Sequence, residues 1–326
     1  MEQTAFSVRT DLALESVENQ EVTDDSGVGV EEEEYGDIKV TWVQVRDKRG
    51  AQSMGKPVGS YITIESEAMK EHDVETHEKI ADILSKQLEK LAKLKPDAAV
   101  LVVGLGNWNV TPDALGPKVV SKILVTRHLS GEMPTELMGR VRSVSAISPG
   151  VMGLTGIETG EIIKGVVERV KPDLVIAIDA LAARRTKRIN ATVQLSDTGI
   201  NPGAGVGNNR MKLNAQSLGV PTVVVGIPTV VDAATLVNDT MDSMLNAMVE
   251  QAPRGTEFFS MLKSLAGEEK YHLISEILNP YTGNMFVTPK EVDAVIERLS
   301  GIIANGINIA LHPGVTSDDM NRFMAI

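Results

Sequence analysis

LVVGLGNWNVTPDALGPKVV, the sequence of residues 101–120, predicts a strand, a glycine turn and a helix in succession. It continues an apolar run that starts at residue 98 and is typical of a buried strand. Thr111, Pro112 and Asp113 form a helix-start pattern, and apolar residues recur at helical spacing behind them. In open α/β sheets, ligands bind at the carboxyl ends of the strands. We therefore expect the carboxylate of Asp113 to lie where chemistry takes place.

Strands and helices continue to alternate on both sides of this stretch. Strands are expected at 98–103, 143–147, 174–178 and 222–226, and helices at 73–94, from Asp113 onward, at 158–170 and at 232–249. Such alternation is typical of parallel strands joined by helical crossovers. The sequence therefore predicts an α/β fold with a mostly parallel sheet that carries helices on both faces.

The two ends of the chain differ from this pattern. Alternating segments at 38–45 and 61–64 predict a small N-terminal β unit with one solvated face. Residues 189–195 are a further strand candidate, antiparallel at an edge or in a hairpin. After residue 251 come helical patterns at 256–265, 268–278 and 289–310, without a strand pattern. We expect an α/β core with the small N-terminal β unit over residues 12–252 and a C-terminal helical appendage of the same domain over residues 253–326. The appendage could pack on the sheet, contact a neighbouring subunit, or do both.

Composition indicates a globular chain. Of the 326 residues, 42% are hydrophobic, which is enough for a sizeable core. No apolar run reaches the roughly 20 residues of a membrane span. The N-terminus lacks the basic-then-apolar pattern of a secretion signal, so we expect a cytoplasmic protein without a membrane partner. The absence of cysteine excludes disulfides, thiolate metal sites and a cysteine nucleophile.

Charge is spread unevenly along the chain. Residues 1–37 contain twelve acidic residues and a single basic one, Arg9, and so carry −11 of the net charge of −12. An acidic, apolar-poor tail of this kind is expected to be disordered or loosely attached. Clustered basic residues with interleaved aromatics, the pattern of a nucleic-acid-binding surface, are missing from the sequence. We therefore expect no direct nucleic-acid partner.

Several common site motifs are missing from the sequence. The turn at 104–109 lacks the third glycine of the dinucleotide fingerprint, and there is no P-loop, Gly-x-Ser-x-Gly elbow or His-Glu-x-x-His zinc motif. Asp-Thr-Gly at 197–199 invites comparison with pepsin-like proteases, which pair two such loops. The second match, at 25–27, lies in the acidic tail, so we interpret both as turns.

Asp113 has one candidate partner, Asp179. The strand at 174–178 ends in Asp179, so both carboxylates are expected at strand ends that face one crevice. Two carboxylates a few Å apart titrate jointly: one keeps a proton and acts as an acid, while the other activates water. The alternative is that each aspartate caps a helix or ties down a loop, and spacing alone slightly favours that alternative.

Two glycine-rich loops and one basic cluster complete the candidate site. Gly150 and Gly203 lie in loops after strands, where glycine lets a backbone approach a ligand and present N–H groups to an oxyanion. Ordinary turn chemistry is the alternative. Arg184, Arg185 and Arg188 belong to the densest basic cluster. Arginine binds carboxylates through a fork of donors, so an acidic substrate side chain could dock there. A solvated or subunit-facing surface is the alternative.

Five long segments of the chain together resemble one protein family. They are NWNVTPDALGPK at 107–118, PGVMGLTGIET at 149–159, IAIDALAAR at 176–184, DTGINPGAGVGN at 197–208 and IPTVVDA at 227–233. In these motifs the chain resembles the germination protease family of spore-forming Firmicutes. The likeness extends from Ser7 to Asp293.

The resemblance implies a fold similar to that of the hydrogenase-maturation endopeptidases and a homotetrameric endopeptidase. The family makes the first cuts in small acid-soluble spore proteins during germination, and it cuts after an acidic residue. It is made in the forespore as a zymogen and acts in the spore core. By the same resemblance, residues 1–11 are a propeptide and the bond between Asp11 and Leu12 is cut on activation. Asp113 and Asp179 match the family's two proposed catalytic aspartates.

Two hypotheses extend the resemblance. One of Arg184, Arg185 and Arg188 is expected to hold the carboxylate before the scissile bond. The acidic tail is expected to keep the zymogen inactive by occupying the substrate groove. We expect no cofactor and no metal site. Soft ligands and histidines are absent from the motif-rich loops, so any ion bound there would have oxygen ligands. Two other functions remain open: a metal-dependent endopeptidase that uses the same two aspartates, and a non-catalytic α/β module whose glycine loops bind an anion.

Overall fold

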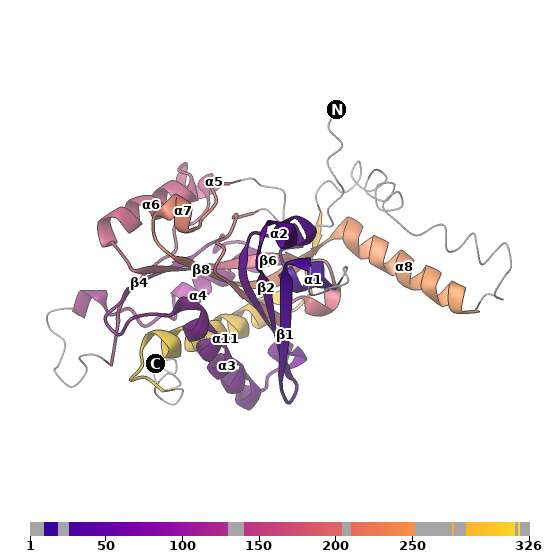
Figure 1. Ribbon diagram of the computed structural model, residues 1–326, viewed down its shortest axis with the longest axis horizontal. Coiled ribbons are helices and arrows are strands. Elements are labelled where there is room, and N and C mark those ends of the chain that lie inside the picture. The colour runs from indigo at the N-terminus through magenta and orange to yellow at the C-terminus, as the bar shows by residue number, and fades with distance from the viewer. Residues whose placement is uncertain are drawn as a thin grey trace.

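The computed structural model describes residues 10–18, 26–129, 140–203, 210–251, 276, 285–316 and 319. Figure 1 shows the elements within these ranges. The strands are β1 (Val28–Tyr35), β2 (Ile38–Val45), β3 (Gly59–Glu65), β4 (Ala99–Gly104), β5 (Ser143–Ile147), β6 (Leu174–Ala183), β7 (Thr192–Ser196), β8 (Thr222–Asp232) and β9 (Phe286–Val287). The helices are α1 (Ala13–Val17), α2 (Lys48–Met54), α3 (Val74–Ala92), α4 (Leu115–Val120), α5 (Met152–Thr155), α6 (Thr159–Val170), α7 (Ala215–Leu218), α8 (Ala233–Gln251) and α11 (Val292–Leu311). Short 3-10 turns are η2 (Glu67–Lys70), η3 (Thr111–Asp113), η4 (Arg127–Leu129) and η6 (Thr186–Arg188).

The described strands form one mixed sheet in the order β1-β2-β3-β7-β8-β6-β4-β5, with β9 paired to β8. The strands β5, β4, β6 and β8 are parallel neighbours, whereas every pairing from β1 through β7 to β8 is antiparallel. The α/β class is confirmed, but the expectation of a mostly parallel sheet is wrong for the half that starts at β1. The predicted N-terminal β unit pairs with β7 through β3, so it extends the main sheet. β7 is antiparallel as expected, but it lies inside the sheet.

Helices cover both faces of the parallel half (Figure 1). Side chains of β4 alternate between the two faces, as the pleat of a strand requires. Val100 and Val102 pack on the face that carries α3, α4 and α11, whereas Leu101 and Val103 pack on the face that carries α6 and α7. Burial on both faces explains why this strand is a continuous apolar run in the sequence.

The C-terminal helix α11 belongs to the main core. Leu299, Ile303 and Ile307 are fully buried in the cluster that also contains apolar residues of α3 and α4. In the described part of the chain, α11 is the one helix whose length and composition would suit a membrane span, and its burial in the core accounts for that composition. This part of the expected appendage is therefore core. The short strand β9 precedes it, although no strand was expected there. The helix expected at 256–265 and nearly all of that at 268–278 lie outside the described residues.

Helix α8 projects away from the body of the molecule (Figure 1). It carries four exposed apolar side chains, those of Val237, Met241, Met244 and Met248. Their spacing of four, three and four residues places them on one stripe of the helix. The stripe is therefore an apolar face that the described part of this chain leaves open to solvent.

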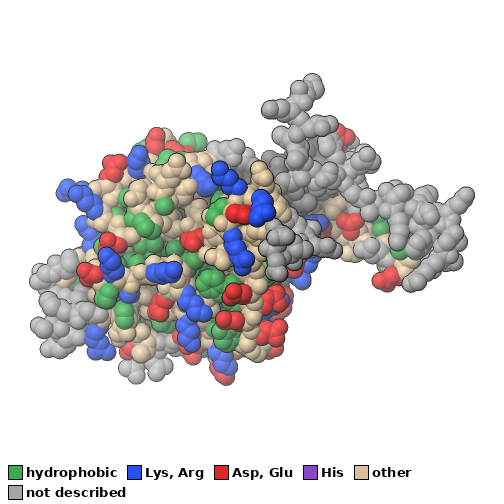
Figure 2. Space-filling view, viewed as in Figure 1, with side chains coloured by type: hydrophobic (Ala, Val, Ile, Leu, Met, Phe, Trp, Pro, Cys, Tyr) green, Lys and Arg blue, Asp and Glu red, His purple; other side chains and the backbone are tan. Residues whose placement is uncertain are grey.

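The described part of the acidic tail packs against the sheet, which corrects the expectation of a loose attachment. Leu12 and Ala13 are fully buried, and β1 pairs with β2 along its whole length. The acidic side chains of residues 31–34 are exposed on β1, and Figure 2 shows acidic groups gathered at this place. Backbone pairing holds the strand while its charges remain in water, and charge on an edge strand also discourages pairing with other chains.

Candidate active site

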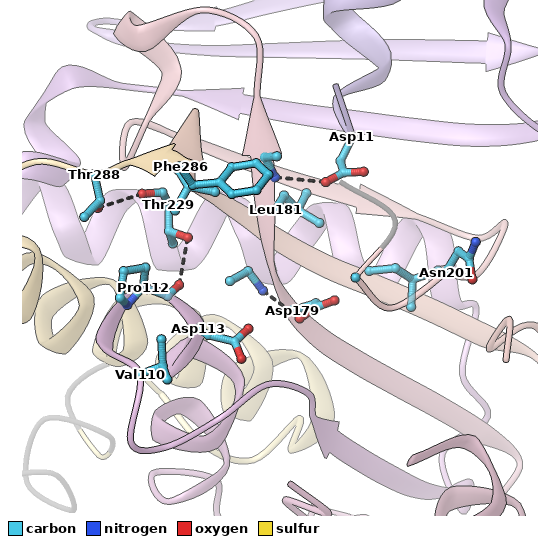
Figure 3. A pocket seen from close by; sticks show the side chains of 15 residues that line it. Asp11, Val110, Pro112, Asp113, Asp179, Leu181, Asn201, Thr229, Phe286 and Thr288 are labelled. Atoms are coloured by element: carbon cyan, nitrogen blue, oxygen red, sulfur yellow. Dashed lines mark hydrogen bonds between the residues drawn. The ribbon is translucent and has the colours of Figure 1, made fainter. Parts of the chain in front are cut away.

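Asp113 follows the carboxyl end of β4, whereas Asp179 lies inside the neighbouring parallel strand β6, which continues to Ala183 and does not end at residue 178 as expected. Asp113 follows β4 in the turn η3, and Asp179 follows the last residue of β6 that pairs with β4. Both aspartates line one cavity of about 340 Å³ (Figure 3). The sequence predicted that these two aspartates face one crevice, and in the structure both line the same cavity.

The turn before Asp113 is built to hold its carboxylate. The backbone N–H of Asn107 donates to the Asp113 carboxylate at 2.8 Å and also to the Asp113 carbonyl at 3.1 Å. Gly106 has φ = +107°, and a Cβ atom there would lie 2.0 Å from the Asp113 carbonyl oxygen. On the other side, the hydroxyl of Thr229 donates to the Pro112 carbonyl at 2.7 Å. The glycine turn therefore positions an acid and does not cradle a nucleotide.

The pKa values of the two carboxyl groups are both raised, by different causes. Burial raises the pKa of Asp113 to about 6, against the hydrogen bond from Asn107 and the charge of Arg210. Burial is the main cause that raises the pKa of Asp179 well above its ordinary value, and the charge of Asp113 is the second. The backbone N–H of Ala180 donates to the Asp179 carboxylate at 2.9 Å and acts to lower this pKa. The charge of an ionised Asp113 favours the protonated form of Asp179, so Asp113 is the member of the pair suited to act as a base and Asp179 the member suited to act as an acid. Acid–base catalysis by two carboxyl groups requires this division.

Asp11 lines the same cavity as the two aspartates (Figure 3). Asp11 forms two hydrogen bonds with Ala182 of β6. Its backbone N–H donates to the Ala182 carbonyl at 3.1 Å, and its carboxylate accepts from the Ala182 N–H at 2.9 Å. Burial is the main cause that raises the pKa of Asp11. The next residue, Leu12, is fully buried in an apolar cluster with Leu181 and Val231. The bond that the resemblance marks for cleavage therefore begins at the wall of the cavity.

Two side chains hold the carbonyl oxygen of Asp11. The Lys56 Nζ donates to it at 3.1 Å, and the Gln194 Nε2 donates at 3.0 Å. Gln194 also accepts from the N–H of Ala13 at 2.6 Å, so it bonds to the chain on both sides of the predicted scissile bond. A second cavity, of about 210 Å³, is lined by Asp11, Lys56 and Gln194. A carbonyl with a cationic donor and an amide donor is polarised toward attack.

The glycine loops also reach the two aspartates. Gly150 and Gly203 line a smaller cavity of about 100 Å³ together with Asp113, Asp179 and Arg210. Both glycines have positive φ angles, +74° and +73°. Gly203 also lines the large cavity. The structure therefore brings both predicted glycines to the site.

The arginine cluster is bonded to acids other than Asp11. Its ion pairs join Arg188 to Glu15, Glu18 and Glu65, Arg185 to Glu18, and Arg184 to Asp239. The Asp11 carboxylate accepts a hydrogen bond from a backbone N–H of β6, and the cation that lowers the pKa of Asp11 is Lys56. Of these acids, Glu15 and Glu18 lie in the segment that follows the predicted scissile bond, and none of the four precedes that bond.

Sequence reasoning missed Lys56, Gln194 and Arg210. Lys56 lies in the loop between α2 and β3, and Gln194 lies in β7, so each comes from a part of the chain remote from the aspartates. Neither residue stands in a motif. The one available signal was the amide of Gln194 within a strand, at 192–196. A buried amide nearly always has a hydrogen-bond partner, so this residue indicated a polar contact without indicating which one.

Among the described residues, no group of three or more His, Asp or Glu side chains is arranged to share a metal ion.

Known proteins match nearly the whole chain. The family model described as germination protease matches residues 7–256 and 247–324. The chain is 52% identical over 319 residues to the germination protease of Caldanaerobacter subterraneus subsp. tengcongensis, and the match covers 98% of each chain. Identity to the germination protease of Clostridium tetani is 51%, over 98% of this chain and all of the relative. Identity to the germination protease of Bacillus cereus is 43%, over 98% of this chain and 97% of the relative. Matches of this extent show that the chain belongs to the germination protease family, a family of peptidases.

Proposed function

We propose that this chain is a spore-germination endopeptidase that cuts small acid-soluble spore proteins after an acidic residue, in the forespore and spore core. Cleavage of the bond between Asp11 and Leu12 activates its zymogen, and Asp113 and Asp179 activate water in both reactions. One observation carries the proposal: Asp11 lines the same cavity as both aspartates. Family membership supports the class of substrate.

The geometry supports a direct attack of water on the peptide bond. The ionised Asp113 takes a proton from water as the water oxygen bonds to the scissile carbonyl carbon. Lys56 and Gln194 stabilise the negative charge that develops on the carbonyl oxygen. Asp179 gives its proton to the leaving nitrogen as the C–N bond breaks. The products are a new carboxyl group and a new amine. Transfer of the proton from Asp113 to Asp179 then restores the starting state of the pair.

The position of residues 10–12 supports the hypothesis that the tail keeps the zymogen inactive. The N–H of Asp11 and the carbonyl of Ala182 form a β-type bond at 3.1 Å, and Leu12 is completely buried. A substrate peptide cannot take the same place until these residues leave. The tail therefore blocks the site and presents the first bond to be cut.

Incubation with a small acid-soluble spore protein tests the proposal. Full-length protein and protein starting at Leu12 are each incubated with the substrate, with and without a chelator, and the new N-termini are sequenced. We expect the shortened protein to cut faster, to cut after acidic residues and to be insensitive to the chelator. Loss of activity with the chelator would favour the metal-dependent alternative, and no cleavage by the shortened protein would favour a binding module.

The exposed stripe of α8 supports the proposal that the protein is a homotetramer. Replacing Met244, which is 63% exposed, with glutamate places a charge in the middle of this stripe. We expect the mass measured by light scattering to fall below that of a tetramer, because a buried unpaired charge opposes association. Val74→Glu, at an exposed apolar residue of α3, is the control. A tetramer that survives Met244→Glu would contradict the role of this stripe.

A further inference from the structure

Thr229 is the extra residue of a β-bulge in β8. In the parallel pair formed by β6 and β8, Leu181 pairs with Pro228 and the next residue, Ala182, pairs with Val230. Thr229 therefore has no partner residue in β6. A bulge is rare between parallel strands, and it bends the strand and re-aims the side chain that it inserts. Proline is tolerated at such a place because no ladder N–H is needed there. The bulge therefore sets the direction of a side chain that is 1% exposed.

The hydroxyl of Thr229 meets the turn that carries Asp113 (Figure 3). It donates to the Pro112 carbonyl at 2.7 Å, and Pro112 directly precedes Asp113 in η3. The carbonyl of Thr229 accepts from the hydroxyl of Thr288 at 2.9 Å, so Thr229 is bonded through both its side chain and its backbone. Thr288 follows β9, which pairs with β8. Two neighbouring strands thus hold the donor that meets the turn.

A second hydrogen bond to η3 lies at the surface. The hydroxyl of Thr111 donates to the carboxylate of Asp293 in α11 at 2.7 Å, and Asp293 is exposed. Water competes for both groups of such a bond, so its net contribution is small. The bond from Thr229 starts at a buried hydroxyl in the wall of the large cavity. It is therefore the stronger of these two restraints on the turn.

The direction of the Asp113 carboxylate depends on the place of this turn. The Asn107 N–H donates to the carboxylate at 2.8 Å and to the Asp113 carbonyl at 3.1 Å. Both bonds require η3 to stay against residue 107. A misplacement of about 1 Å in a reacting group costs on the order of 100-fold in rate. A restraint on the Pro112 carbonyl is therefore also a restraint on the proposed base.

We propose that Thr229 is a positioning residue, which holds Asp113 in place for the attack of water through its bond to the Pro112 carbonyl. The inference rests on the proposed role of Asp113 as the base, and it adds the element that fixes this base. Thr229 exchanges no proton with water or substrate in this role. Loss of its hydroxyl therefore affects kcat more than KM.

Three variants at two buried threonines test the positioning role. The assay uses protein starting at Leu12 and a peptide with the sequence of residues 7–20. Thr229→Val removes the hydroxyl but keeps the branched shape, and we expect kcat to fall about 10- to 100-fold while KM changes by less than about threefold. Thr229→Ser restores the donor and should recover most of the lost kcat. Thr192→Val is the matched control, because Thr192 is fully buried in β7 and its hydroxyl has no hydrogen-bond partner in the described part of the chain.

The pH profile separates positioning from a loss of folded protein. The bond from Asn107 lowers the pKa of Asp113, which is about 6. A turn that moves away weakens this bond, so the acidic limb of kcat/KM in Thr229→Val should lie at higher pH than that of the parent. A smaller folded fraction would scale the profile without moving this limb. The charged groups that act on Asp113 or face its turn are unchanged by the substitution: Arg210, Asp179 and Asp293.

Two results would overturn the positioning role. One is a Thr229→Val variant with the kcat and the acidic limb of the parent, and the other is a loss of kcat that Thr229→Ser does not recover. Failure of the proposed function has a different signature, because full activity of Asp113→Asn would remove the base whatever Thr229→Val does. An inactive Asp113→Asn beside a fully active Thr229→Val would leave the proposed function standing and remove only Thr229.

Discussion

Asp113→Asn and Asp179→Asn are each expected to lower kcat/KM for peptide cleavage by about 10³-fold, since each removes one half of a proton-transfer pair. The asparagine at position 113 cannot take a proton from water, and that at position 179 cannot give one to the leaving nitrogen. Cleavage of the bond after Asp11 in the full-length chain should stop as well. The measurement is the initial rate of peptide cleavage and the appearance of the Leu12 N-terminus.

Thermal stability and the pH profile distinguish a catalytic loss from a folding defect. Because the pKa of Asp179 is raised in the folded state, the native protein holds the proton of this carboxyl to higher pH than the unfolded chain does. This carboxyl therefore stabilises the fold less and less as pH rises above about 4. Asp179→Asn removes that penalty, so its melting temperature at pH 7 should equal or exceed that of the parent.

The pKa of Asp113, about 6, sets the acidic limb of the activity profile. The carboxylate form is the base, so kcat/KM should rise with pH through about 6 and level off above it. Asp197→Asn is the control, because Asp197 bonds to the Ser60 N–H in a turn and does not line the large cavity. A fully active Asp113→Asn variant would remove the aspartate pair from the mechanism.

Lys56→Met is expected to lower kcat by about 10²-fold and to leave KM nearly unchanged. The lysine ammonium bonds to the Asp11 carbonyl oxygen at 3.1 Å, and the charge on that oxygen grows only as the transition state forms. The loss of one such donor costs roughly 10²- to 10³-fold in kcat. Steady-state kinetics on a peptide with an acidic residue before the cut measures the split between kcat and KM.

Lys212→Met is the matched control for charge. Lys212 lines the same second cavity as Lys56, but no hydrogen bond joins it to the scissile carbonyl. Its replacement removes a positive charge from the cavity without removing a donor, and so should change kcat by less than about threefold. Equal losses in the two variants would show that the lysines act through long-range charge alone, which would contradict the donor role of Lys56.

The sequence alone determined the α/β class and the two aspartates. Period and apolar content are local properties, so the strands at 98–103 and 174–178 and the helices beside them could be recognised within a short window, although β6 continues to Ala183. Carboxyl ends of parallel strands share one edge of the sheet, so the positions of Asp113 and Asp179 after two apolar runs predicted that both face one crevice. Motif matches over nearly the whole chain supplied the family.

Only the tertiary structure decided which remote residues meet at that crevice. An alternating segment shows that a strand exists but not which strand it pairs with, so the antiparallel half of the sheet could not be foreseen. For the same reason Lys56 and Gln194 gave no signal, because they reach the Asp11 carbonyl across 45 and 183 residues. The ion-pair partners of the arginines also depend on the tertiary structure. A buried guanidinium such as that of Arg188 requires an acidic partner, and the fold places Glu15 beside it. Contacts between distant parts of the chain depend on packing, which no local pattern encodes.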